Sequence, residues 1–214
     1  SNISVDKEGA TGRRAVTIKF IDFKEPKNNE FLAVSQFWVK GPKFTDRPDI
    51  IIFINGIPLA VIECKSPIAR ETGVGDAIEQ LLRYEREIPA LFRTNQLLLG
   101  ANLLGAKYGV IGSDYDSFHE WKAKPEEKLP ILTQHPTILE MKSLGLLDEK
   151  DLPHTPAPQD VTIAALFNKR NFLDIIRNFT VFESGDGKVK KKVCRYQQFA
   201  AVQKLAARVL TEKD

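Results

Sequence analysis

Residues 47–65 read RPDIIIFINGIPLAVIECK and form one of the two most apolar stretches of the chain. Asp49–Ile54 and Leu59–Ile62 are nearly continuous apolar runs, which is typical of strands buried on both faces in the middle of a sheet. Asn55-Gly56 lies between the two runs and favours a tight turn between antiparallel strands. The stretch therefore predicts a hairpin at the centre of a sheet.

Periodic segments on both sides of this hairpin predict further strands and a covering helix. Apolar residues recur at helical spacing over Val74–Glu87, and Pro89 ends that pattern. Strands are expected at Gln96–Leu99, Tyr108–Ile111, Arg14–Phe23 and Phe31–Val39, the last two forming an antiparallel pair. A sheet with a helix packed across it places the chain in the α/β class.

The composition changes after residue 122. Residues 122–160 contain six prolines and many charges, so we expect a connecting region with one short helix near Thr137–Leu146. Beyond it we expect helices at Val161–Phe167, Lys169–Asn178 and Arg195–Leu210, and an extended segment at Phe179–Glu183. We therefore divide the chain into a core at residues 1–122, a proline-rich connection at 123–160 and a helical segment at 161–214.

The overall charge is nearly balanced. The chain of 214 residues has 31 Lys plus Arg and 28 Asp plus Glu, a net charge of +3. Proteins that hold DNA mainly by neutralising phosphates usually carry a larger basic excess, so this chain alone is expected to bind DNA weakly. The two cysteines have no zinc-type spacing and no secretory signal is visible, which favours a reducing compartment.

Three charged side chains lie at one end of the predicted hairpin. Glu63 and Lys65 are two residues apart and share a face of their strand, while Asp49 opens the partner strand. Two carboxylates suit Mg²⁺, which can activate a bound water, and Lys65 can orient that water or stabilise charge developing on a phosphate. Metal-dependent phosphodiester cleavage explains these residue types together; the alternative is a buried ion pair of Glu63 with Lys65 or with Arg47.

The cleavage hypothesis depends on the register of the hairpin. A strict two-residue turn at Asn55-Gly56 would pair positions whose numbers sum to 111, which places Asp49 on the opposite face from Glu63. A longer turn or a bulge shifts the sum to 112 and places Asp49 opposite Glu63. Pro58 cannot donate a hydrogen bond to a neighbouring strand and makes such a bulge plausible.

Gln80 and Tyr84 lie four residues apart on the predicted helix and share one of its faces. Taken alone, the pair is explained by a solvated glutamine beside an amphipathic packing tyrosine. Its position just after the D…ExK hairpin gives it more weight. Trp38 and Trp121 are assigned to core or rim packing rather than to base stacking.

Four motifs occur in this order: Arg47-Pro48-Asp49, Asn55-Gly56-Ile57-Pro58, Glu63-Cys64-Lys65 and Gln80-x-x-x-Tyr84. Together they resemble the amino-terminal nuclease region of the restriction (R) subunit of type I restriction-modification enzymes, in the branch of the PD-(D/E)xK superfamily that carries a Q-x-x-x-Y motif. The resemblance covers most of the chain. It implies a restriction-endonuclease-like fold, with a central mixed sheet flanked by helices and a small, mostly helical linker region after it.

The resemblance also implies roles for the site residues. Asp49 and Glu63 would be the metal ligands for Mg²⁺, and Lys65 would be the catalytic lysine. Gln80 and Tyr84 would be accessory residues that align the site or the DNA backbone. Some superfamily members add an acidic residue from a helix before the first strand, and no such helix is evident in this sequence.

A larger assembly is implied as well. Type I R subunits continue into an ATP-driven translocase, and they act on double-stranded DNA with methylase and specificity subunits, the methylase holding S-adenosylmethionine, in the prokaryotic cytoplasm. Arg195-Tyr196-Gln197-Gln198-Phe199 resembles the start of that motor, with Gln198 matching a glutamine that contacts adenine; an ordinary glutamine opening a helix is the alternative. The chain contains no G-x-x-x-x-G-K-[ST] loop, so we do not expect it to hydrolyse ATP by itself.

Basic residues are the remaining candidates for DNA contacts. Residues 183–195 hold five basic and two acidic side chains, a local charge of +3. We predict phosphate contacts for Arg47, Lys188, Lys190, Lys191 and Lys192, the four lysines being otherwise the solvated side of a strand. Two other functions stay open at this point: a nuclease of recombination or repair from the same superfamily, and a degenerate nuclease fold that serves as a docking module.

Overall fold

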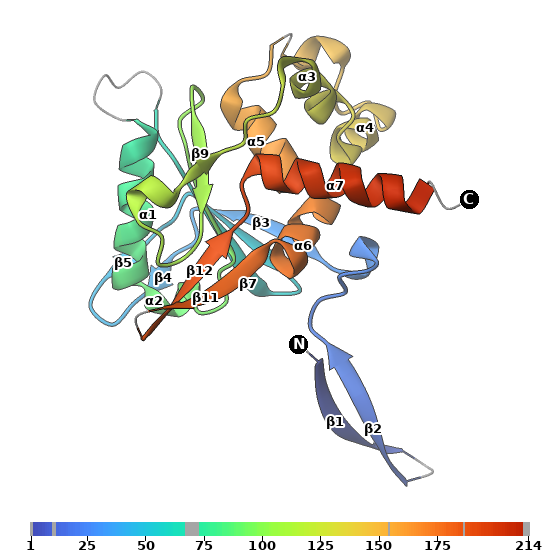
Figure 1. Cartoon of the computed structure of the whole chain (residues 1–214). Helices are drawn as coiled ribbons and strands as arrows, with labels where there is room; N and C mark the ends of the chain where they lie inside the picture. Colours follow the sequence, from blue (N-terminus) through green and yellow to red (C-terminus); the bar gives the residue numbers. More distant parts are fainter. Residues whose placement is uncertain (1, 10–11, 67–72, 154, 186, 212–214) are drawn as a thin grey trace.

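The computed structural model describes residues 2–9, 12–66, 73–153, 155–185 and 187–211, with side chains from residue 18 onward. At its centre lies a mixed sheet that, in this described part, has six strands in the order β10-β9-β8-β7-β6-β3 (Figure 1). Neighbouring strands are antiparallel except β7 and β8, which run parallel. The strands are β3 (Phe31–Ser35), β6 (Ile50–Ile54), β7 (Ile57–Cys64), β8 (Leu97–Ala101), β9 (Ala106–Gly109) and β10 (His119–Glu120). The predicted α/β class is confirmed.

The central hairpin β6–β7 contains the bulge that the sequence analysis required. Phe53 pairs with Pro58 across the two-residue turn Asn55–Gly56, so the pairing starts at a sum of 111. Asn55 and Gly56 have φ angles of 51° and 77°, the left-handed values that a tight hairpin turn needs at both positions. The register then shifts by one residue between Phe53 and Ile52, and Ile50 pairs with Ile62 at a sum of 112.

Two helices cover one face of the sheet. These are α1 (Val74–Glu87), which connects β7 to the parallel strand β8, and the short α2 (Pro89–Phe92). Their apolar side chains form one core cluster with the sheet, which includes Ile51, Val61, Ile78, Leu81, Tyr84 and Leu98. Gly100 of β8 permits the close approach of α1, because a Cβ at this position would lie 3.1 Å from Cγ1 of Ile78. The helix predicted over Val74–Glu87 is confirmed at both ends.

Helices from the second half of the chain cover the other face: α5 (Pro158–Leu166), α6 (Lys169–Asn178) and α7 (Tyr196–Thr211) (Figure 1). Their buried residues join a second cluster with the sheet, which includes Ile62, Leu97, Leu99, Tyr108, Leu166, Phe172 and Phe199. Alternate residues of a strand point to opposite faces, so Ile62 and Val61 contribute to different clusters. The result is a sheet held between two helical layers.

Two predictions about the upstream strands are wrong. β2 (Gly12–Lys19) pairs with β1 (Asn2–Gly9) and not with the segment that begins at Phe31. That segment does not stay a single strand to Val39: β3 ends at Ser35 and pairs with β6, and β4 (Val39–Lys40) pairs with β5 (Thr45–Asp46). Alternation of polar and apolar residues identifies a strand but not its partner, which explains the first error.

The connecting region holds more helix than expected. Residues 123–160 contain α3 (Pro125–Thr133), α4 (Pro136–Ser143) and a 3-10 turn η3 (Glu149–Asp151), where the sequence predicted one helix near Thr137–Leu146. Pro125 occupies the first turn of α3, a position that needs no N–H donor, and Glu127 accepts a hydrogen bond of 3.0 Å from the backbone N–H of Lys124. Proline here begins the helix instead of preventing it.

The remaining elements lie at the ends and edges of this architecture. They are the 3-10 turns η1 (Pro26–Asn28) and η2 (Tyr115–Ser117) and the antiparallel pair β11 (Thr180–Gly185) and β12 (Lys188–Val193). Among the described residues, every helix is too short or too polar to cross a bilayer.

Candidate active site

The register of β6 and β7 brings two carboxylates to one face of the sheet. Ile50 pairs with Ile62, so the next step along the ladder sets Asp49 opposite Glu63. Residues directly opposite each other in an antiparallel pair project from the same face. Oδ2 of Asp49 also accepts a hydrogen bond of 2.8 Å from the backbone N–H of Cys64, which fixes the carboxylate against the end of β7. The geometric condition set by the sequence analysis is therefore met.

Glu63 is the most deeply buried charged side chain of this site, with 2% of its surface exposed. Its Oε1 accepts a hydrogen bond of 2.9 Å from Nζ of Lys65. Its Oε2 is buried and accepts no hydrogen bond from any described residue. Burial raises the pKa of Glu63; the hydrogen bond from Lys65 and the backbone N–H of Asp49 oppose this shift, and the negative charge of Asp49 adds to it. A buried carboxylate oxygen without a donor is a position that a bound cation would stabilise.

A chain of hydrogen bonds connects this carboxylate to helix α1. Nζ of Lys65 donates to Oε1 of Gln80 at 2.5 Å, and Nε2 of Gln80 donates to the hydroxyl oxygen of Tyr84 at 2.5 Å. Tyr84 is 3% exposed, and burial raises the pKa of its phenol. Gln80 is thus a link between strand and helix, and not the solvated neighbour that an isolated Q-x-x-x-Y pair would suggest. The structure brings all five predicted site residues into one connected group.

Gln36 completes the group and was not predicted as a site residue. Its Nε2 donates to Oδ1 of Asp49 at 2.7 Å, and its backbone N–H donates to the carbonyl oxygen of Asp49 at 2.9 Å. The residue adopts a φ of 55°, a conformation that non-glycine residues rarely take and that tends to occur near functional sites. The sequence shows at this position only a glutamine next to Phe37 near the end of a predicted strand. That pattern predicts neither the left-handed turn nor the contact with Asp49.

The donor set suits a hard divalent cation. Asp49 and Glu63 offer carboxylate oxygens, and the unpaired Oε2 of Glu63 is the observation that favours a metal over a purely structural ion pair. The described residues contain no cluster of three or more His, Cys, Asp or Glu side chains arranged for a metal. Two carboxylates suffice for Mg²⁺, which keeps several waters when bound. Among the described residues, the elements before β6 are strands and one 3-10 turn.

The ion pair considered as an alternative exists in part. Lys65 pairs with Glu63 at 2.9 Å, whereas the guanidinium of Arg47 lies 4.9 Å from the ring centre of Trp38. The Lys65 pair alone would satisfy one carboxylate oxygen of Glu63 and leave the other without a donor. A metal site and a structural ion pair would thus both contain the contact between Lys65 and Glu63. The unpaired Oε2 of Glu63 is explained by the metal site and not by the ion pair.

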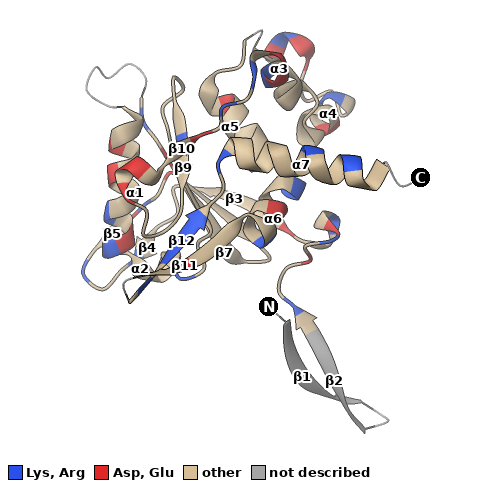
Figure 2. Ribbon diagram, in the orientation of Figure 1, with Lys and Arg blue, Asp and Glu red and all other residues tan. Residues whose placement is uncertain are grey.

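The predicted DNA-contacting lysines differ in their surroundings. Figure 2 shows β12 as a blue strand, and Lys188, Lys190 and Lys192 are exposed there, with Lys192 paired to Glu183 on β11. Nζ of Lys191 instead donates to the carbonyl oxygen of Asn95 at 2.8 Å and to Oε1 of Gln96 at 2.7 Å. Lys191 therefore attaches the β11–β12 hairpin to the loop before β8. Of the four lysines, Lys188, Lys190 and Lys192 are exposed and accessible to a ligand from solvent.

Lys191 predicts a specific pH dependence of stability. Burial lowers its pKa to about 8, below the value of about 10.4 expected in an unfolded chain. Between these two values the unfolded state binds more protons, so the contribution of Lys191 to the free energy of unfolding rises with pH. The slope is at most about 1.4 kcal/mol per pH unit, and partial exposure reduces it.

Urea unfolding at a series of pH values from 7 to 10.5 measures this effect. The free energy of unfolding of the wild type, minus that of Lys191→Met, should increase with pH by up to that slope between the two pKa values. Methionine keeps the apolar stem of the side chain and has no group that titrates. Lys190→Met, an exposed neighbour on the same strand, is the control and should match the wild-type slope. Parallel curves for wild type and Lys191→Met would contradict the prediction.

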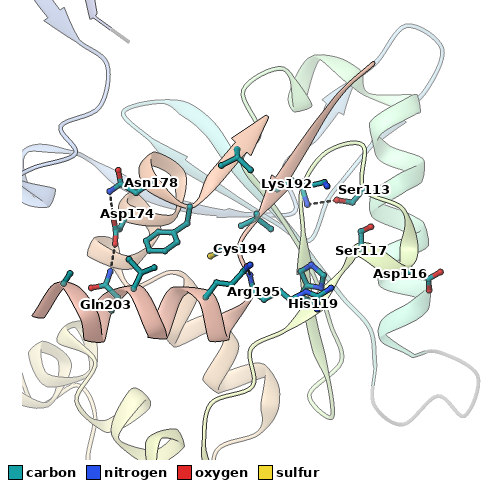
Figure 3. Close-up of a pocket in the computed structure, with 17 residues that line it drawn as sticks. Ser113, Asp116, Ser117, His119, Asp174, Asn178, Lys192, Cys194, Arg195 and Gln203 are labelled. Carbon is teal, nitrogen blue, oxygen red and sulfur yellow. Dashed lines mark hydrogen bonds between the residues drawn. The ribbon is translucent and has the colours of Figure 1, made fainter. Parts of the chain in front are cut away.

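Gln198 lies at a cavity far from the carboxylates along the chain. Its Oε1 accepts a hydrogen bond of 2.8 Å from the backbone N–H of Arg195, so it acts as a cap at the start of α7. It also lines a cavity of about 930 Å³ between β11–β12, α7 and residues 113–119 (Figure 3). His119 and Arg195 face this cavity too, and burial, then the charge of Arg195, lowers the pKa of His119. Adenine contact by Gln198 stays a prediction.

Comparison with known proteins gives a consistent set of relatives. Residues 1–117 match the family model described as type I restriction enzyme R protein N terminus. The type I restriction enzyme HindI endonuclease subunit of Haemophilus influenzae is 32% identical over 187 residues, which cover 86% of this chain and 16% of that protein. A Methanocaldococcus jannaschii protein named as a type I restriction enzyme endonuclease subunit, MjaIXP, is 31% identical over 90% of this chain and 18% of its own length. The chain thus spans less than a fifth of either relative.

Proposed function

The chain belongs to the family of type I restriction enzyme R protein N termini, and from that membership we propose that it is the Mg²⁺-dependent nuclease domain that cuts double-stranded DNA for a type I restriction enzyme. The observation that carries the proposal is the buried, unpaired Oε2 of Glu63 opposite Asp49, with Lys65 hydrogen-bonded to the other carboxylate oxygen of Glu63. The family favours this function over the recombination or repair nucleases that the sequence motifs alone left open.

Asp49 and Glu63 would hold the magnesium ion. When bound, the ion would lower the pKa of a coordinated water and neutralise charge on the scissile phosphate. Asp49 is positioned for this by hydrogen bonds from Gln36 and from the backbone of Cys64, so its carboxylate keeps its orientation without the ion. Outer contacts of this kind orient metal ligands and tune their affinity.

Lys65 would act on the phosphate and on the attacking water. Its ammonium has three N–H donors, two of which reach Glu63 and Gln80. The third can donate to the water or to a non-bridging phosphate oxygen, where it stabilises the charge that develops during cleavage. Gln80 and Tyr84 would be positioning residues, because the amide of Gln80 fixes the ammonium and the buried hydroxyl of Tyr84 fixes the amide.

The remainder of the proposed activity lies beyond this domain. Because the chain spans less than a fifth of its relatives, we place ATP binding, translocation and the choice of DNA sequence in other parts of the R subunit and in methylase and specificity subunits, with S-adenosylmethionine on the methylase. DNA would be cut without sequence preference by this domain once translocation delivers it. The near-neutral charge of the domain fits this division, since its own affinity for DNA is expected to be low.

Metal removal on the isolated chain tests the proposal. Micromolar chain incubated with supercoiled plasmid in Mg²⁺ should nick it slowly, and EDTA should stop the nicking until Mg²⁺ is restored. Asp49→Asn should abolish the Mg²⁺-dependent nicking, whereas Asp22→Asn, an aspartate held by its own hydrogen bonds near η1, should leave it unchanged. Nicking that persists in EDTA or in Asp49→Asn would overturn the metal mechanism.

A further inference from the structure

A hairpin beside the site carries aromatic side chains in contact with solvent. We call residues 37–47, which contain β4 and β5, the aromatic hairpin. Phe37, Trp38 and Phe44 are 46%, 63% and 53% exposed. Trp38 is therefore not a core residue and, of the two positions expected for it, only the rim remains, while Trp121, 8% exposed, does pack in the core. A ligand that covered these rings would remove their apolar surface from contact with water, which is favourable. The hairpin is therefore suited to bind a ligand.

Strand alternation sorts the side chains of the aromatic hairpin by sign of charge. Val39 pairs with Asp46, and this pair faces α1: Val39 packs against the cluster that contains Tyr84, and Oδ2 of Asp46 is buried. Lys40 pairs with Thr45 on the outer face, and Lys40, Lys43 and Arg47 are exposed. Figure 2 shows this β4–β5 hairpin beside α1, with blue on its loop. The acidic group is turned inward, and the outward charges are all positive.

Trp38 and Arg47 form the centre of this surface. One step beyond the Val39–Asp46 pair, the guanidinium of Arg47 lies over the indole of Trp38 at 4.9 Å from the ring centre. This cation–π contact holds the ring in place while leaving most of it exposed. Rings fixed next to cations are the arrangement that proteins use to stack bases and hold the adjoining phosphates.

The backbone connects this surface to the carboxylates on both sides. Arg47 lies two residues before Asp49 in the chain. Trp38 lies two residues after Gln36, and Gln36 donates two hydrogen bonds to Asp49. Two residues of extended chain span at most about 7 Å. The left-handed turn at Gln36 therefore has two effects: it orients Asp49 and it brings Trp38 to the edge of the site.

We propose that the aromatic hairpin binds unpaired bases of a DNA strand at the edge of the cleavage site, with a base stacked on Trp38 and the neighbouring phosphates held by Arg47, Lys40 and Lys43. This inference rests on the proposed nuclease function and adds to it a specific preference of the site for a strand whose bases are exposed. Such a strand arises where a duplex is opened or distorted. The aromatic hairpin would hold that strand with its phosphate backbone directed to Asp49.

Tryptophan fluorescence measures this binding without requiring cleavage. The chain has two tryptophans, so Trp121→Phe leaves Trp38 as the sole tryptophan, whose emission can be excited apart from that of the tyrosines. Titration of that variant with a dT oligonucleotide in EDTA should quench its emission, more strongly than titration with a duplex of equal length. The affinity of each variant is measured by the fluorescence polarisation of a labelled oligonucleotide. Trp38→Ala should weaken binding at least about fivefold, and Trp38→Phe should weaken it less because an aromatic ring remains.

Leu146→Ala is the control, since Leu146 is an apolar residue that is 68% exposed in the connecting region, outside both basic hairpins. It should leave the affinity for dT unchanged. Arg47→Gln should weaken binding and reduce the slope of log affinity against log salt by about 0.7. No quenching by dT, equal loss in the Trp38 and Leu146 variants, or quenching caused only by a partner protein would overturn the proposal. Cleavage that depends on Asp49 with unquenched Trp38 would leave the nuclease function standing and reject this inference alone.

Discussion

In an R subunit that contains this chain, we expect Lys65→Ala to lower DNA cleavage by about 10³-fold or more while ATP hydrolysis and translocation continue at their normal rates. The size follows from removing a preorganised cation next to the reacting phosphate, an interaction that typically contributes 10²- to 10³-fold or more. The loss of cleavage should lie at or above the upper end of this range, because Lys65 also donates hydrogen bonds to Glu63 and to Gln80. Its removal takes away the side-chain donor to Glu63 and leaves Oε1 of Gln80 without the ammonium.

Plasmid cleavage and ATP hydrolysis are measured side by side on the reconstituted enzyme. Lys122→Ala is the control, since Lys122 is an exposed lysine in a loose ion pair with Glu120 and should retain both activities. A buried carboxylate left without its cation destabilises a fold, so the melting temperature of each variant is recorded as well. Lys65→Met, which keeps the apolar stem, separates loss of chemistry from loss of folding. Loss of ATP hydrolysis together with cleavage would count against a separable nuclease domain.

Glu63→Ala should remove Mg²⁺ binding by the isolated chain. Loss of the outer contacts of a metal site already costs about 10- to 100-fold in affinity, and a direct ligand is expected to cost at least as much. In the wild type, Mg²⁺ at 100 times its dissociation constant should stabilise the fold by about 2.7 kcal/mol, which raises the melting temperature of a chain of this size by about 5 to 10 °C. The variant should show no such rise.

Calorimetric titration and thermal melts with and without Mg²⁺ make this measurement. Glu85→Gln is the matched control, because Glu85 is a partly buried glutamate on α1 whose pKa burial also raises, and its carboxylate accepts from the backbone N–H of Gly112. It should keep the full Mg²⁺ response. Equal Mg²⁺ binding by wild type and Glu63→Ala would leave no metal site at these carboxylates and would favour a docking module with a nuclease-like fold.

Much of the centre of the molecule was predictable because its sequence patterns are strong. The apolar runs around Asn55-Gly56 specified a buried hairpin, and the parity of its register specified that Asp49 and Glu63 meet only with a bulge or a longer turn. The helical period of Val74–Glu87 placed Gln80 and Tyr84 on one face. These inferences use only neighbours along the chain, for which the physical rules are local.

The features that escaped prediction depend on contacts between distant segments. The partner of β3 could not be read from its alternation, and the left-handed turn at Gln36, which gives Asp49 two of its hydrogen bonds, has no local signature in a glutamine. Lys191 looks like its neighbours in sequence, but strand alternation turns it alone toward Asn95 and Gln96. The exposure of Trp38 depends on which face of a two-residue strand meets α1.

The bulge in β6–β7 ties the length of the turn to the spacing of the two acids in the sequence. With the spacing between Asp49 and Glu63 unchanged, a turn that takes in one more residue keeps the two carboxylates on one face only if the bulge between Ile52 and Phe53 closes. At this spacing turn length and bulge are therefore coupled, and neither can drift alone without separating the two carboxylates. Among relatives that keep both acids at the same spacing, a hairpin whose turn is one residue longer should be free of a bulge, so the two features together would report whether a diverged copy still has a competent site.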